Sequence, residues 1–183
     1  RRAEFKGSPK DYEPYDAASD KPAVLNPFFR GYHYHITGLH HGAKGFPTEN
    51  EQIVDRSIKR LFNKISAHED EIVQYEEFML DDADACIIAY GSVSLAAKDA
   101  ILKLRGQGVR VGLFRPITLW PSPARKLREL GERFNKILIA ELNLGQYLLE
   151  VQRACLRDDF KTLLKANGRP ISPSEIIEKV KEL

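Results

Sequence analysis

Residues 81–146 read DDADACIIAYGSVSLAAKDAILKLRGQGVRVGLFRPITLWPSPARKLRELGERFNKILIAELNLGQ, and this stretch decides the fold. Three short apolar runs occur in it, and each is followed by a turn and an amphipathic segment. The runs cover residues 86–90, 109–114 and 137–142. Such alternation predicts an α/β fold, in which a three-layer, mostly parallel sheet carries helices on both faces.

The loops at one edge of this sheet are the natural place for a functional site. Parallel strands present their carboxyl ends at the same edge, and ligands or partners meet the loops there. These loops cover residues 91–92, 115–122 and 143–146. Their candidate ligand or interface residues are Gly91, Ser92, Arg115, Trp120, Asn143, Gly145 and Gln146.

Capping signals mark where the helices begin. Ser92 and Asn143 can each cap the helix that follows, and Ser122 before a proline predicts another helix start. Ser172 and Glu175 have the spacing of a capping box, which predicts a short terminal helix. Buried helix positions are expected at Val93, Ala96, Ala97, Ala100, Ile101 and Leu104, at Leu127, Leu130 and Phe134, and at Leu148, Leu149, Gln152, Cys155 and Leu156.

Length and charge limit the class of protein. The 183 residues suit one domain plus an appendage. Lys and Arg number 28 against 26 Asp and Glu, so no nucleic-acid partner is expected. No run approaches the roughly 18 apolar residues of a membrane span, and no signal peptide is present. The sequence therefore predicts a cytoplasmic protein that does not bind a membrane. Basic side chains expected on the solvated surface are Arg105, Arg110, Arg115, Arg125, Lys126, Arg128 and Arg133.

The two cysteines do not indicate a metal site. Cys86 lies inside an apolar strand and Cys155 on the apolar side of a helix. Zinc and iron–sulfur sites need about four ligands, so metal binding is not expected from this pair. Both cysteines are predicted to be buried packing residues.

The chain ahead of the sheet divides into two parts. Residues 1–47 are predicted to be an irregular linker ending in a histidine-rich loop, and residues 48–80 a connector helix with an acidic joint. Thr48 and Glu51 have capping-box spacing at the start of that helix. Because the chain begins without Met, we expect a fragment whose exposed aromatics, such as Phe28 and Phe29, lie on a missing neighbour.

Residues 31–45, GYHYHITGLHHGAKG, hold four of the five histidines. His33 and His35 would share one face of an extended strand, which leaves metal binding open, although no carboxylate or cysteine accompanies them. A polar site at an interface and a structural loop are the other interpretations. The candidate residues of this stretch are His33, His35, Thr37, Gly38 and His41.

Two patterns in the sheet region point to chemistry only weakly. The segment GSVS at residues 91–94 could cradle a phosphate at a helix start, but it lacks the glycine spacing and the lysine of nucleotide-binding loops. Glu141 lies at the end of the third strand and could act as a general acid or base. A carboxylate without a visible partner more often has a structural role, and no catalytic residue is assigned in this chain.

Several segments resemble a known family. YGSVSLAAKDAI, GVRVGLFRPITLWPSP and AELNLGQ are similar to the transketolase-C-terminal-type domain in the alpha subunit of 2-oxoacid:ferredoxin oxidoreductases, most of all the 2-oxoglutarate type. YHYHITGLHHGAKGFPTENEQIVDRSIKRLFNKI resembles the connector of the same subunit. The resemblance covers residues 32–183. The family usually has Phe where Ser122 stands and Glu where His40 stands.

The resemblance implies a complex that uses thiamine diphosphate with Mg²⁺, a 4Fe-4S cluster and coenzyme A to convert a 2-oxoacid into acyl-CoA, CO₂ and reduced ferredoxin. It also implies a hetero-oligomer in which the beta subunit holds the diphosphate and the cluster, and a missing N-terminal domain of the alpha subunit completes the site. This chain alone would then bind no cofactor and be inactive. Its expected work is subunit assembly and closure of the active-site cleft.

Three alternatives stay open. The chain could be an independent module that binds coenzyme A or phosphate at residues 91–92 and 145–146. It could be a self-contained hydrolase or transferase that uses Glu141 and a histidine. It could also belong to the pyruvate or branched-chain version of the oxidoreductase.

Overall fold

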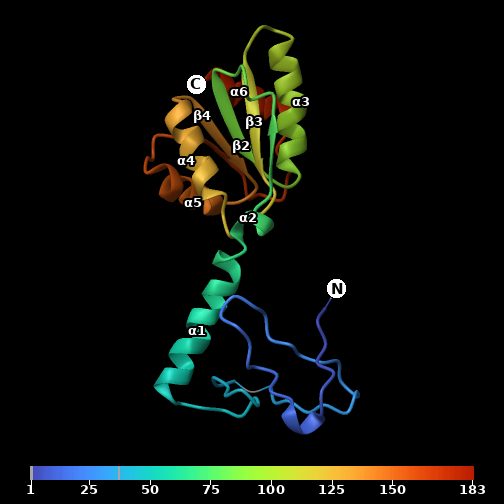
Figure 1. Ribbon diagram of the computed structural model, residues 1–183. Helices are drawn as coiled ribbons and strands as arrows, with labels where there is room; N and C mark the ends of the chain where they lie inside the picture. Colours follow the sequence, from blue (N-terminus) through green and yellow to red (C-terminus); the bar gives the residue numbers. More distant parts are fainter. Residues whose placement is uncertain (1, 37) are drawn as a thin grey trace. The chain divides into compact units, whose positions relative to one another are not determined.

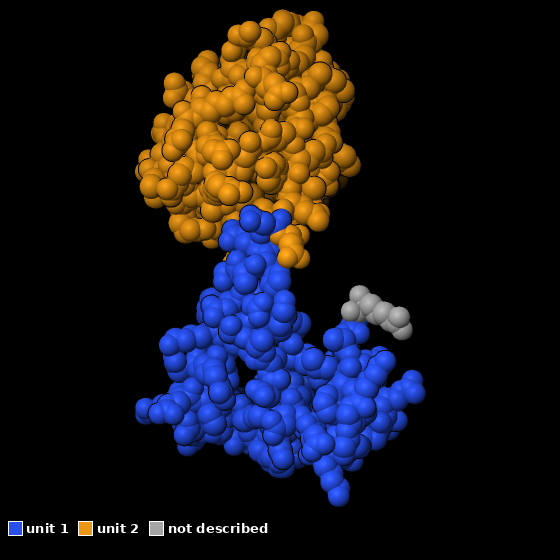
Figure 2. Space-filling view, in the orientation of Figure 1, with its two compact units in different colours: residues 1–70 blue, residues 71–183 orange. Residues whose placement is uncertain are grey.

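The computed structural model describes residues 2–36 and 38–183 and divides into two compact units (Figure 2). Residues 1–70 form what we call the N-terminal unit, and residues 71–183 form the sheet unit. The division falls ahead of residue 81, where the sequence placed the start of the α/β domain. The reason is a strand at residues 75–78 that already belongs to the sheet.

The sheet unit contains one five-stranded sheet with the order β1-β3-β2-β4-β5 (Figure 1). Strands β2, β3, β4 and β5 are parallel, and only β1 runs antiparallel, beside β3. This architecture confirms the predicted mostly parallel α/β class. The strands are β1 (Tyr75–Phe78), β2 (Ala85–Ala89), β3 (Val111–Pro116), β4 (Ile137–Glu141) and β5 (Lys161–Leu164).

Helices cover both faces of the sheet. The helices α3 (Val93–Arg105) and α6 (Pro173–Lys181) pack on one face, and α4 (Ala124–Arg133) and α5 (Gln146–Cys155) on the other. Side chains alternate between the faces along each strand. In β2, Ile87 belongs to the core under α3, while Ile88 belongs to the core under α4.

The buried side of α5 differs from the prediction. Tyr147, Val151 and Ala154 face the core, whereas Leu149 and Leu156 are exposed. The buried residues recur at intervals of four and three and so form one stripe. The prediction is correct for Leu148 and Cys155, which are half-buried and pack against the core, and wrong for Leu149 and Leu156, which lie on the exposed side of the helix. The stripes predicted for α3 and α4 are confirmed.

Strand β1 occupies the stretch that the sequence presented as an acidic joint. Its carboxylates are paired: Glu76 with Lys98 and Arg115, and Glu77 with Lys126 at 2.7 Å. These cations come from α3, β3 and α4, so they bring the strand to the edge of the sheet from three elements. The expectation that the basic residues form only a solvated surface is therefore wrong for Arg115 and Lys126.

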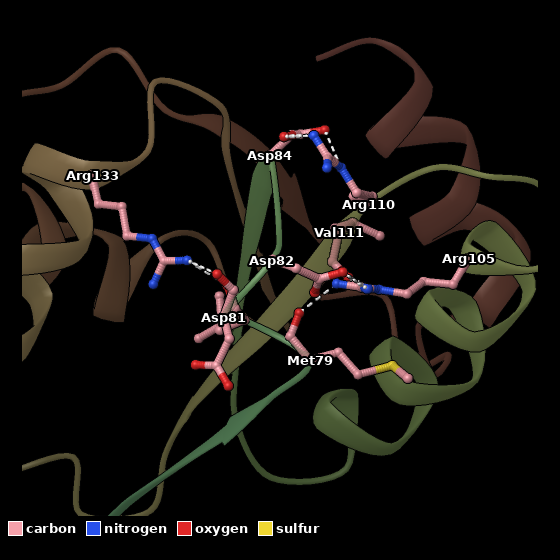
Figure 3. Close-up of polar contacts among 9 residues, drawn as sticks. Met79, Asp81, Asp82, Asp84, Arg105, Arg110, Val111 and Arg133 are labelled. Atoms are coloured by element: carbon pink, nitrogen blue, oxygen red, sulfur yellow. Dashed lines mark hydrogen bonds and ion pairs between the residues drawn. The ribbon is translucent and has the colours of Figure 1, made fainter.

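Two further arginines hold the loop between β1 and β2 (Figure 3). Arg105 of α3 donates to the carbonyl oxygens of Met79 and Val111 at 2.7 and 3.0 Å, and to Asp82 at 2.8 Å. Arg133 of α4 donates to the carbonyl oxygens of Leu80 and Asp81, both at 2.7 Å. Helices on opposite faces of the sheet thus clamp the same loop.

We expect Arg105→Ala to lower the free energy of unfolding by about 2 kcal/mol, because hydrogen bonds from a charged group contribute roughly 1.5–3 kcal/mol. The matched control is Arg110→Ala, which removes an equally well-formed pair with Asp84. That pair is solvated, with side chains 59% and 61% exposed, so its loss should lower the free energy of unfolding much less than the loss of Arg105. Urea unfolding of the variants measures the difference, and equal losses would contradict the clamp.

The terminal helix α6 begins with the predicted capping box. Ser172 accepts from the amide of Glu175, and the Glu175 carboxylate accepts from the amide of Ser172 at 2.8 Å. Lys165 also donates to Glu175, at 2.7 Å. The ammonium group of Lys165 and the hydrogen bonds from Ser172 lower the pKa of Glu175 to about 2.

This lowered pKa predicts acid sensitivity. Because the folded chain binds the Glu175 proton more weakly than the unfolded chain, Glu175 stabilises the fold fully above its ordinary pKa of 4.5. The contribution is lost as the pH falls from there towards about 2. Glu175→Gln should flatten the decline of the urea midpoint in this range. Glu178→Gln, on the same helix and without a hydrogen bond or ion pair to the described residues, should keep the wild-type slope.

The N-terminal unit is mostly irregular. Apart from a short turn η1 (Pro9–Asp11), its first helix is α1 (Glu51–Ser66), and α2 (Glu69–Ile72) follows. Tyr12 is buried, donates to the carbonyl of Val24 and packs on Phe5 and Tyr32. Some aromatics of this region therefore pack on one another, while Phe28 and Phe29 are exposed.

Helix α1 begins two residues later than the predicted cap at Thr48 implies. Asn50 is its cap and accepts from the amides of Gln52 and Ile53, because the asparagine stands directly before the helix and Thr48 does not. Against the described residues, α1 buries none of its side chains. Its apolar stripe is solvated, with Ile58, Leu61 and Phe62 exposed. In the described part of the chain, no helix combines the length and apolar character needed to cross a bilayer.

Candidate functional site at the carboxyl edge of the sheet

Two side chains hold the start of α5: Glu141 is the last residue of β4, and Asn143 lies just after the strand. Asn143 accepts from the amides of Gly145 and Gln146, both at 2.8 Å. Glu141 accepts from the next two amides, those of Tyr147 and Leu148, both at 3.1 Å. The first four amides of a helix have no partner within it, and here two side chains bond all four. A phosphate at this helix start would have to displace Asn143.

Tyr90, directly after β2, joins the same network. Its hydroxyl donates to Glu141 at 3.1 Å and accepts from the side-chain amide of Asn143 at 2.7 Å. Burial, and then the charge of Glu141, raise the pKa of Tyr90, so the phenol remains a donor. Glu141 is only 1% exposed and carries three hydrogen bonds. Its carboxylate therefore acts as a structural cap that substrate cannot reach, which counts against the general-base interpretation.

The loop after β3 is fixed to α5 by a buried hydroxyl pair. Ser122 and the hydroxyl of Tyr147 lie 3.2 Å apart, and burial raises the pKa of Tyr147 to about 12. Ser122 makes no side-chain cap, because Pro123 occupies the position before α4 and the serine points to Tyr147 instead. The prediction that Ser122 caps this helix is wrong. A cis peptide bond joins Trp120 to Pro121.

Exposed apolar side chains follow these two strands. Those of the β3 loop are Ile117, Leu119 and Trp120, and those of the β4 loop are Leu142 and Leu144. Trp120 is 67% and Leu144 81% exposed. We call these five residues the apolar rim. Both loops leave the same edge of a parallel sheet, where contacts with other molecules are expected.

The remaining loop residues contribute less. Gly91 has a φ of +55°, and Ser92 stands at the start of α3 but makes no capping hydrogen bond, so its predicted capping role is wrong. Arg115 donates to Glu76 at 3.2 Å. Its Nε is the one buried side-chain nitrogen or oxygen that lacks a partner among the described residues.

The histidine candidates lie in the N-terminal unit. His33, His35 and Gly38 are exposed, His41 is half-buried and stacks on Tyr15, and Thr37 falls outside the described residues. In residues 2–36 and 38–183, no three side chains of His, Cys, Asp or Glu gather closely enough to hold a metal ion. Cys86 is buried as predicted, with burial raising its pKa to about 12, and Cys155 is half-buried.

The structure thus brings together Asn143, Gly145 and Gln146 of the predicted set and adds Tyr90, Glu141 and Tyr147 to them. Sequence reasoning missed both tyrosines. A signal was present, since each directly follows a strand end or opens a helix, but their partners stand 51 and 25 residues away in the chain.

The fold and this edge define an α/β domain of the layered, mostly parallel class, whose best-formed polar cluster is structural and whose rim is apolar. The chain belongs to the family described as pyruvate:ferredoxin oxidoreductase core domain II, which residues 83–176 match.

Relatives of known function are similar over a wider range. The 2-oxoglutarate synthase subunit KorA of Methanothermobacter marburgensis is 36% identical over 174 residues, which are 94% of this chain and 46% of that subunit. The ketoisovalerate oxidoreductase subunit VorB of the same organism is 36% identical over 67% of this chain and 35% of its own length. The chain spans about half the length of the 2-oxoglutarate synthase subunits it matches.

A solved structure agrees with the fold. The 2-oxoglutarate:ferredoxin oxidoreductase from Magnetococcus marinus, with 2-oxoglutarate, coenzyme A and succinyl-CoA bound, superposes with a TM-score of 0.77 and 26% identity. The match covers 93% of this chain and 30% of that one.

Proposed function

We propose that this chain is the C-terminal part of the alpha subunit of a cytoplasmic 2-oxoacid:ferredoxin oxidoreductase that converts 2-oxoglutarate, coenzyme A and oxidised ferredoxin into succinyl-CoA, CO₂ and reduced ferredoxin. The observation that carries the proposal is the 36% identity to a 2-oxoglutarate synthase subunit along 94% of the chain. The match to the ketoisovalerate subunit covers only 67%, which favours 2-oxoglutarate over a branched-chain substrate.

The residues of this chain do not fit the iron–sulfur cluster of such an enzyme. A 4Fe-4S cluster takes four thiolates, and the chain has two cysteines. The thiol of Cys86 is fully buried with its pKa raised to about 12, and that of Cys155 donates to the carbonyl of Leu127 at 3.1 Å. In our proposal the beta subunit holds the cluster, the thiamine diphosphate and its Mg²⁺. An N-terminal domain of the alpha subunit completes the site.

The part that remains for this chain is assembly. The two rim loops are held rigidly, one by Glu141 and Asn143 and the other by the pair of Ser122 and Tyr147. Rigid loops that present exposed apolar side chains bind a partner with little loss of conformational freedom. We propose that the apolar rim packs against the neighbouring subunit or domain and closes the active-site cleft.

Copurification tests the function. The complex that contains this chain should carry a beta subunit and iron–sulfur absorption, and should reduce a dye when given 2-oxoglutarate and coenzyme A together. Pyruvate and 2-oxoisovalerate should react more slowly. A complex that turns over none of the three oxoacids would contradict the proposal, as would thiamine diphosphate binding tightly to the isolated 183-residue chain in calorimetry.

The assembly role gives a separate prediction. Leu144→Ala should weaken association of the complex by about tenfold, because a few buried apolar anchors dominate an interface. Leu102→Ala is the matched control. This leucine is also exposed, at 54%, but lies near the C-terminal end of α3, away from the rim loops. Sedimentation of the reconstituted complex measures both. Association unchanged by Leu144→Ala and by Trp120→Ala would remove the rim from the interface.

A further inference from the structure

The N-terminal unit contains a cavity that the proposed function does not use. Its volume is about 440 Å³, within the roughly 300–1,000 Å³ typical of small-molecule sites. Three segments line it: the coil around residues 15–19, the loop around residues 41–43, and the polar side of α1 between residues 53 and 63. The apolar stripe of α1 lies on another side of the helix, so the wall that faces the cavity is hydrophilic.

Two guanidinium groups stand one helical turn apart in this wall. Arg56 lines the cavity and has no hydrogen bond or ion pair to the described residues. Arg60 also lines it and donates one bond, from Nη1 to the carbonyl of Lys21 at 3.0 Å, which leaves its other donors unused. Residues four apart lie on the same face of a helix. Paired guanidinium forks match the oxygen atoms of a phosphate group.

Another part of the lining is aromatic and fixed in place. Tyr15 and His41 both line the cavity, and their rings stack with centroids 4.8 Å apart and an interplanar angle of 22°. The hydroxyl of Tyr15 donates to the carbonyl of His35 at 2.6 Å, and its amide donates to the carbonyl of Ala43. A preorganised aromatic wall of this kind suits a planar ring, because stacking needs little further ordering.

The charge of the lining favours an anion with hydroxyl groups. Lys59 and Asp55 are paired at 2.8 Å and offset each other. Arg56 and Arg60 then face a single carboxylate, that of Asp16, which leaves one net positive charge. A carboxylate beside a phosphate-binding pair can accept hydrogen bonds from sugar hydroxyls, because an ionised carboxylate is an acceptor only.

We propose that this cavity binds the phosphorylated end of a nucleotide, with the phosphate on Arg56 and Arg60, the base against Tyr15 and His41, and the ribose hydroxyls towards Asp16. The inference concerns residues other than the apolar rim and requires no oxoacid chemistry, and it stands whether the nucleotide is free or part of coenzyme A.

Titration of the 183-residue chain with AMP tests the site. We expect saturable binding with a dissociation constant below about 1 mM. Adenosine and inorganic phosphate should each bind at least tenfold more weakly, because each uses only one wall. NMR signals of His41 and Ala43 should shift during the titration. Coenzyme A, which ends in an adenine nucleotide, is the second probe: tighter binding than AMP identifies a cofactor end as the occupant, and equal or weaker binding identifies a free nucleotide.

Arg56→Ala should weaken AMP at least tenfold, since the side chain has no structural partner to lose. Lys64→Ala removes a positive charge from the same helix outside the cavity lining and should change binding less than about twofold, because solvated charges act weakly at a distance. Unchanged unfolding curves verify that both variants remain folded. Binding that does not saturate, equal effects of the two substitutions, or AMP no tighter than phosphate would each overturn the inference.

Discussion

Glu141→Ala is expected to lower the free energy of unfolding of the sheet unit by about 3–5 kcal/mol, because the donors left without a partner each cost roughly 1–3 kcal/mol. The carboxylate is 1% exposed and accepts from the amides of Tyr147 and Leu148 and from the hydroxyl of Tyr90. Alanine removes all three bonds, and the buried site admits little water to replace them. Trp120 is the only tryptophan, so its fluorescence during urea unfolding reports on this unit.

Glu141→Gln is the matched control. Glutamine keeps one acceptor oxygen and nearly the same volume but turns an NH₂ group towards donors. We therefore expect the free energy of unfolding to fall by roughly half as much as in Glu141→Ala. In the assembled enzyme, turnover per folded complex should be the same for Glu141→Gln and wild type, since the carboxylate is a cap. A loss of turnover without a loss of stability would restore the acid–base interpretation. Wild-type stability of Glu141→Ala would show that the network contributes nothing to the fold.

Gly112→Ala is expected to destabilise the sheet unit by about 3 kcal/mol or more, since overpacking a rigid core commonly costs 1–3 kcal/mol and this contact is with backbone. A Cβ at residue 112 would stand 2.4 Å from the carbonyl oxygen of Met79 and 2.8 Å from the Cα of Leu80. Moving these atoms aside costs free energy, because both belong to the backbone. Arg105 bonds the carbonyl of Met79 and Arg133 that of Leu80, so a displaced loop also loses its clamps.

The same substitution at another glycine separates crowding from a general effect of alanine. Gly106 follows α3 with a φ of −61°, and a Cβ there would meet nothing closer than 3.4 Å. Gly106→Ala should therefore be neutral or slightly stabilising, through the lower entropy of the unfolded chain. Equal urea midpoints for Gly112→Ala and Gly106→Ala would mean that the loop and β3 lie farther apart than the structure has them.

The Glu141 network bears on the proposed function. The polar residues at the carboxyl edge of the sheet serve to hold the loops, and the loops present apolar side chains. This arrangement is the one that the proposed assembly role requires.

The sequence by itself determined the layered α/β class, the three central strands and the start of α6. These features are local: a strand alternates every two residues, a helix repeats every 3.6, and a capping box such as that of Ser172 and Glu175 spans four positions. The family resemblance rested on contiguous motifs for the same reason. The sequence also shows the spacing of the histidines, but spacing alone does not identify what they bind. The roles proposed for His33 and His35 therefore stay predictions.

The tertiary structure decided everything that depends on residues far apart in the chain. Strand β1 pairs with β3, and its Glu76 bonds to Lys98 and Arg115, which lie 22 and 39 residues further on. Glu141 changed from a possible catalyst to a helix cap because Tyr90, 51 residues earlier, and the amides of α5 bond to it. A carboxylate in a sequence shows its charge and its position, but only folding decides which donors surround it and whether any of its oxygens remains free for chemistry.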